Sequence, residues 1–70
     1  MAPLTPLKLA RLEADKSQWD VSKETGIAQT TISLYEREYR EPTRDHKRIL
    51  AKLYRKRLKD IWGNHSGYVT

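Results

Sequence analysis

The stretch QWDVSKETGIAQTTISLYER, residues 18–37, decides how this chain folds. Its first half is predicted to be a short helix, because Ser17 and Asp20 have the spacing of a capping box, in which hydroxyl and carboxylate each bind an amide of the first turn. Gly26 is expected to end this helix in a left-handed conformation, which glycine adopts without strain. Ile27 then turns toward the core. The stretch therefore predicts two short helices joined by a tight turn.

The second helix of the stretch has two faces of different character. Ile32 and Tyr35 are three residues apart and are expected to point into the core. The opposite face carries mostly short polar side chains, whereas a surface helix is usually richer in Glu and Lys. Such side chains are suited to reading base edges in a major groove. They are Gln29, Thr30, Thr31, Ser33, Leu34 and Arg37.

The stretch resembles the helix-turn-helix of the Cro and phage-repressor family, often called the XRE family. Counted from Gln18, the acidic residue that follows the family motif falls on Glu36, and the resemblance extends over about residues 7 to 62. It implies an all-α fold, a compact lambda-repressor-like bundle of about five short helices with a central helix-turn-helix. The apolar positions and the turn glycine of the motif fall on Val21, Gly26, Ile27, Ile32 and Tyr35.

The flanking segments carry signals for three further helices. Thr5 is expected to cap a helix from about residue 6 to 15, with a proline at its first position. Thr43 follows a proline and can cap a helix over about residues 44–55. A short last helix is predicted over residues 58–62. The apolar stripe of the fourth helix is expected to consist of Ile49, Leu50, Leu53 and Tyr54.

The composition limits the classes of protein to which this chain can belong. Seventy residues suffice for one small domain, and we divide the chain into a loose N-terminus (1–5), a helix-turn-helix domain (6–62) and a mobile C-terminal tail (63–70). The chain has no cysteine, paired catalytic carboxylates, glycine-rich phosphate loop or metal-spaced His cluster, so we expect no enzyme, no cofactor and no metal. No apolar run is long enough to cross a membrane and no secretory signal is present, which favours a cytoplasmic protein associated with the nucleoid.

The net charge of +5 is concentrated in one segment. Residues 37–59 hold ten Lys or Arg and three acids, whereas residues 1–36 carry a net charge of −1. A phosphate-binding face would explain this asymmetry, and so would an ordinary solvated helix surface. The adjacent helix-turn-helix favours nucleic acid. Backbone phosphates are therefore expected to be contacted by Arg37, Arg40 and Arg44.

The second helix of the motif supplies the candidate base-reading residues. Gln29 is the best candidate for bidentate recognition of adenine. Thr30 and Leu34 are the next expected contacts, and Leu34 is suited to a thymine methyl group. Thr31 and Ser33 are expected to contact bases or phosphates, and we assign Ser33 to the bases and Thr31 to a phosphate.

The resemblance also implies roles for residues outside this helix. Gln18 is expected to bind a phosphate and to brace Gln29. In the family, an arginine at the position of Arg11 pairs with the acid that is Glu36 here. Arg11 could instead be a snorkelling arginine at the edge of its helix, but we favour the ion pair. Trp19 could pack over the preceding turn or remain exposed for a partner, and we expect packing.

The expected function is sequence-specific binding of double-stranded DNA by a small transcriptional repressor of phage or bacterial type. The alternative is a protein-interaction module, such as a DNA-binding antitoxin or an adaptor. A homodimer on an inverted repeat is possible through a carboxy-terminal patch. The competing explanation for this patch is that Trp62 closes the core over the first helix. The residues of the patch are Leu58, Ile61 and Trp62.

Overall fold

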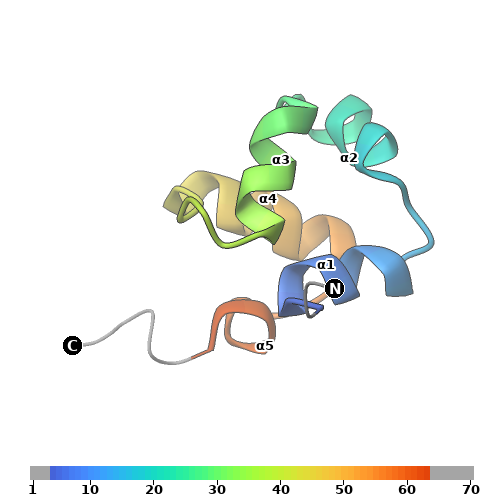
Figure 1. The fold of residues 1–70 in the computed structure, drawn as a ribbon. Coiled ribbons are helices and arrows are strands. Elements are labelled where there is room, and N and C mark those ends of the chain that lie inside the picture. Colours follow the sequence, from blue (N-terminus) through green and yellow to red (C-terminus); the bar gives the residue numbers. More distant parts are fainter. Residues whose placement is uncertain (1–3, 64–70) are drawn as a thin grey trace.

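The computed structural model describes residues 4–63 and contains only helices there. The predicted all-α fold is confirmed, because five helices form one bundle with the two motif helices at one end and the last helix at the other (Figure 1). The expectations for residues 1–3 and 64–70 lie outside the described residues. The helices are α1 (Pro6–Glu13), α2 (Gln18–Thr25), α3 (Gln29–Glu36), α4 (Arg44–Tyr54) and α5 (Leu58–Trp62).

Three helices begin where the sequence predicts a cap. The hydroxyls of Thr5 and Thr43 each accept a hydrogen bond from the amide three residues further on. The capping box is present, with Ser17 Oγ accepting from the Asp20 amide at 3.0 Å and Asp20 Oδ2 accepting from the Ser17 amide at 2.9 Å. Both hydrogen bonds lower the pKa of Asp20, and the bond from the Ser17 backbone amide has a larger effect than the bond with the Ser17 hydroxyl. Ala28 gives α3 no side-chain cap.

In the described residues, every helix is followed by a residue with positive φ, and two of these five residues are the glycines Gly26 and Gly63. Gly26 has φ +79° after α2, as its sequence context predicts. Asp15, Glu38 and Arg55 have φ between +58° and +62° after α1, α3 and α4, although a non-glycine residue is strained there. After α3, the amide that follows Glu38 donates to the carbonyl of Leu34 at 3.0 Å, as in a Schellman motif. The first helix accordingly ends at Glu13 and not at Asp15.

The core is formed by apolar residues from all five helices and from the turn between α2 and α3. Helix α5 packs against α1 and α4 and closes the core at the end away from the motif (Figure 1). No helix in residues 4–63 has the length and apolar character needed to cross a bilayer. The buried apolar residues are Leu7, Ala10, Val21, Ile27, Ile32, Tyr35, Leu50, Ala51, Tyr54 and Ile61.

Two sequence-based expectations about packing are wrong. Ile49 is 40% exposed, because the buried face of α4 is centred on Leu50, Ala51 and Tyr54 and the residue before Leu50 falls on the far flank of this face. Trp19 is 66% exposed and does not pack over the turn. It precedes the buried Val21 by two residues, which places it on the opposite side of α2.

Candidate nucleic-acid interface

Helix α3 exposes a polar face opposite its buried residues. Ile32 and Tyr35 are 0% and 5% exposed and fix the rotation of the helix about its axis. At 3.6 residues per turn, the outward direction then falls on Thr30, Leu34 and Arg37. The side chains of Thr30 and Arg37 are exposed, and that of Leu34 is half-buried. The structure therefore presents the predicted face to the surroundings.

The remaining predicted contacts of α3 lie on its two flanks. Gln29 and Ser33 are half-buried and line a groove shared with Gln18 at the start of α2. Thr31 is half-buried and lies on the other flank, beside Tyr35. Base-reading candidates thus occupy the centre of the face and one flank, while Thr31 is separated from Gln29 and Ser33 by the width of the helix.

A chain of hydrogen bonds holds the first residue of α3 in place. Gln29 Nε2 donates to Gln18 Oε1 at 2.5 Å, and Gln18 Nε2 donates to Glu36 Oε1 at 3.0 Å. An amide has two N–H donors and one acceptor oxygen. The Gln29 side chain therefore keeps Oε1 and one N–H free among the described residues, which is the pair of groups that bidentate recognition of adenine needs.

This series of hydrogen bonds ends at a buried ion pair between α1 and α3. Arg11 Nε donates to Glu36 Oε2 at 2.7 Å, and Arg11 Nη2 donates to Glu36 Oε1 at 3.2 Å. The two residues are 8% and 3% exposed. The structure therefore contains the predicted ion pair and not a snorkelling arginine. Arg11 Nη1 also donates to the carbonyl of Lys16 at 2.8 Å.

Two further contacts that position α3 have no signal in the sequence. Thr5 Oγ1 donates to the backbone carbonyl of Glu36 at 2.6 Å, which ties the residue before α1 to the end of α3. Tyr35 Oη and His46 Nδ1 are 2.7 Å apart, with the two rings edge to face. These pairs are 31 and 11 residues apart in sequence, and no local pattern predicts them.

Arginines continue the polar face beyond the end of α3. Arg37, Arg40 and Arg44 are all exposed, and the described residues offer none of them a carboxylate within ion-pair distance. The acids Glu36 and Glu41, which are next to Arg37 and Arg40 in sequence, are paired with Arg11 and Lys47 instead. These guanidinium groups are therefore available for phosphate oxygens.

The family model described as Helix-turn-helix (HTH_3) matches residues 7–61 of the chain. The match covers all of α2, α3 and α4. The chain is a Cro/C1-type helix-turn-helix protein. This family binds DNA, and no catalytic family was found with it. No curated protein and no solved structure matches the chain.

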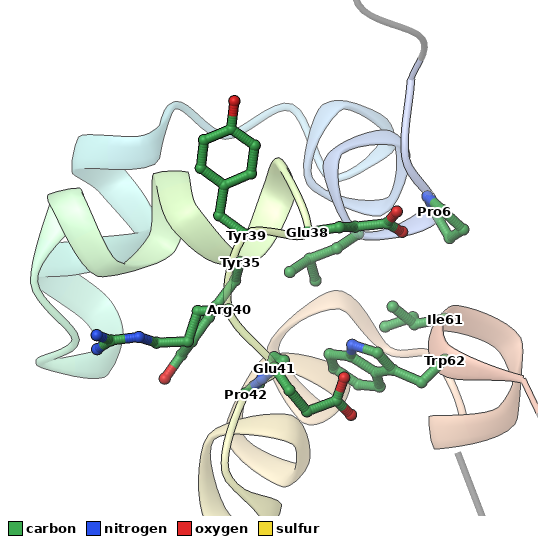
Figure 2. Close-up of a pocket in the computed structure, with 10 residues that line it drawn as sticks. Pro6, Tyr35, Glu38, Tyr39, Arg40, Glu41, Pro42, Ile61 and Trp62 are labelled. Atoms are coloured by element: carbon green, nitrogen blue, oxygen red, sulfur yellow. The ribbon is translucent and has the colours of Figure 1, made fainter. Parts of the chain in front are cut away.

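In this helix-turn-helix protein, α2 and α3 are the motif and Gly26 makes its turn. Of the residues in the carboxy-terminal patch, Ile61 is 5% exposed and belongs to the core. Trp62 is half-buried, with Lys47 Nζ 5.7 Å from its ring centre. Ile61, Trp62 and Pro6 line a hollow of about 360 Å³, and Figure 2 shows these side chains around it. Of the patch, only Leu58 is freely exposed, at 41%.

Proposed function

We propose that this protein is a sequence-specific transcriptional repressor that reads the major groove of duplex DNA with α3. The observation that carries the proposal is the chain of hydrogen bonds from Gln29 through Gln18 to Glu36. It fixes the orientation of one amide at the start of the exposed face and leaves that amide with a donor and an acceptor. Such a preorganised side chain loses little conformational entropy when it binds a base.

The remaining polar groups support a duplex as the ligand. Gln18 lies at the start of α2, where backbone amides and the helix dipole favour a phosphate. Beyond α3, the exposed arginines would bind the phosphate backbone of the DNA and set the register of the protein on the duplex without reading its sequence. Glu36, which accepts a hydrogen bond from Gln18, is paired with Arg11, so its charge does not oppose a phosphate at this face. The proposed phosphate contacts are Gln18, Thr31, Arg37, Arg40 and Arg44.

A homodimer on an inverted repeat is part of this proposal. One recognition helix covers only a few base pairs, and two-fold dimers with half-sites about 34 Å apart extend the site. Because Ile61 is buried, the surface available at this end of the molecule consists of Leu58 and the exposed part of Trp62. Analytical ultracentrifugation with a selected duplex should give two chains per site, whereas a one-to-one complex on an asymmetric site would contradict the dimer.

The substitution Gln29→Ala tests the base-reading assignment. We expect the affinity for the preferred site, obtained by random-site selection and footprinting, to fall by about 1–3 kcal/mol, the contribution of one good bidentate contact. Binding to random duplex and the thermal melting temperature should stay close to those of the wild type. An equal loss on both duplexes would show that Gln29 is a general contact and does not read sequence.

The second candidate function, a protein-interaction module, is favoured by one observation. Trp19 is 66% exposed on the outer side of α2, and exposed aromatic side chains are common anchors at protein interfaces. Titration of random duplex across a salt series separates the two functions. A DNA-binding protein loses affinity steeply with salt because phosphate contacts release counterions, whereas an adaptor without DNA contacts would bind weakly with a flat slope.

A further inference from the structure

The groove beside α3 extends past the base-reading residues to the start of α1. Its volume is about 630 Å³, and its lining includes Gln29 and Ser33 of α3, Lys8 of α1 and Tyr39 of the turn after α3. We propose that a phosphodiester of the bound duplex lies in this groove, with the Lys8 ammonium and the Tyr39 hydroxyl as its donors. The proposal rests on the DNA-binding function above and extends the contact surface to α1.

Helix α1 is held rigidly against α3, so Lys8 has a fixed place beside the recognition helix. Lys8 precedes Arg11 by three residues, which puts the two side chains on neighbouring parts of one helix face. Arg11 is bonded to Glu36 of α3, and Thr5 Oγ1 donates to the Glu36 carbonyl at 2.6 Å. These contacts anchor the first two turns of α1, and the lysine therefore borders the groove without a flexible backbone beneath it.

The charges around the groove favour an anion. Lys8 and Arg37 both line it and are exposed, and neither forms an ion pair with the described part of the chain. Of the two acids in the lining, Glu36 is paired with Arg11. Glu38 borders this groove and the hollow of Figure 2, and the figure shows its carboxylate directed toward Pro6. Two unpaired cations thus remain on the groove.

Tyr39 combines a fixed backbone with an exposed side chain. Its amide donates to the Leu34 carbonyl at 3.0 Å in the turn that ends α3. The residue as a whole is nevertheless 76% exposed. Figure 2 shows the ring pointing away from Trp62 and the neighbouring hollow. A tyrosine has only two side-chain torsions to order, and its ring can contact a deoxyribose while its hydroxyl donates to the phosphate.

Salt-dependent binding to random duplex distinguishes an ionic contact from a neutral one. Fluorescence anisotropy with a duplex of about 20 bp, between about 50 and 200 mM NaCl, gives the slope of log affinity against log salt. Lys8→Gln should reduce this slope by about 0.9, so that salt weakens binding over this range about 3.5-fold less than in the wild type. Lys8→Arg should keep the wild-type slope. Tyr39→Phe should lower affinity about 2- to 10-fold at every salt concentration without changing the slope, because a neutral donor releases no counterion.

Lys59→Gln is the matched control, because Lys59 is an exposed lysine on α5, at the opposite end of the bundle from α2 and α3 (Figure 1). Circular dichroism melts should show that all variants remain folded, since exposed substitutions of this kind change stability little. If Lys8→Gln has the slope of Lys59→Gln while Arg37→Gln lowers it, the groove proposal is wrong and DNA binding stands. If the wild type itself shows no salt-dependent binding to duplex, both proposals fail.

Discussion

Removal of the Glu36 carboxylate should destabilise this domain severely. Glu36→Ala deletes the acceptor of two Arg11 hydrogen bonds and one Gln18 hydrogen bond and leaves Arg11, 8% exposed, without its counter-charge. Loss of one partner from a buried pair costs about 3–5 kcal/mol. At roughly 0.05–0.15 kcal/mol per residue, a chain of 70 residues has only about 3–10 kcal/mol of stability. The variant should therefore be close to unfolding at room temperature.

Urea and thermal unfolding followed by far-ultraviolet circular dichroism measure this effect. For a domain of this size the expected loss lowers Tm by roughly 12–40 °C. Glu24→Ala is the control, because the pair of Glu24 with Lys16 is partly exposed, with side chains 44% and 25% accessible. Such a pair contributes about 0–1 kcal/mol. Equal melting temperatures for Glu36→Ala and the wild type would refute the reasoning and remove the ion pair from the account of the fold.

A double substitution separates the structural role of the pair from its role at the interface. Arg11→Met combined with Glu36→Leu fills the site with apolar side chains, and such replacements are often neutral or stabilising by about 1–4 kcal/mol. Gln18 nevertheless loses its acceptor, so Gln29 is braced less firmly. We expect a folded protein with reduced discrimination between the preferred site and random duplex. Unchanged discrimination would show that the hydrogen-bond chain does not orient Gln29.

Three further changes test local features of the fold. Glu38→Gly should raise stability by about 0.5–1 kcal/mol in thermal melts, because relief of left-handed strain outweighs the extra freedom of glycine in the unfolded chain; a lower Tm would contradict this. Tyr54→Phe should raise stability by about 1 kcal/mol in urea titrations, because the buried Tyr54 hydroxyl has no partner among the described residues; a loss would reveal a hydrogen bond to that hydroxyl. The lowered pKa of Asp20 means that its contribution to stability is complete above its ordinary value of 3.8 and is lost as pH falls through the lowered value. The melting temperature of Asp20→Asn should accordingly depend less on acid pH than that of the wild type, and identical pH profiles would exclude this contribution.

The sequence by itself predicted the features that depend on neighbouring residues. Capping by Ser17 and Asp20, the left-handed turn at Gly26 and the inward direction of Ile32 follow from spacings of a few residues, and all three are present in the structure. Local chemistry suffices here because a cap, a turn or a helix face is determined within one or two helical turns. The polar face of α3, and with it the candidate base contacts, followed from the same periodicity.

The tertiary structure decided which of several allowed packings each side chain adopts. Trp19, Ile49 and Ile61 have similar apolar character, yet the first two are exposed and the third is buried, because burial depends on which helix covers a given flank. The hydrogen bond from Thr5 to the Glu36 carbonyl joins residues 31 positions apart. Lys8 and Tyr39, which line the same groove, have the same separation in sequence. No local pattern encodes such contacts, since they exist only after the helices have packed and fixed the distance between segments remote in the chain.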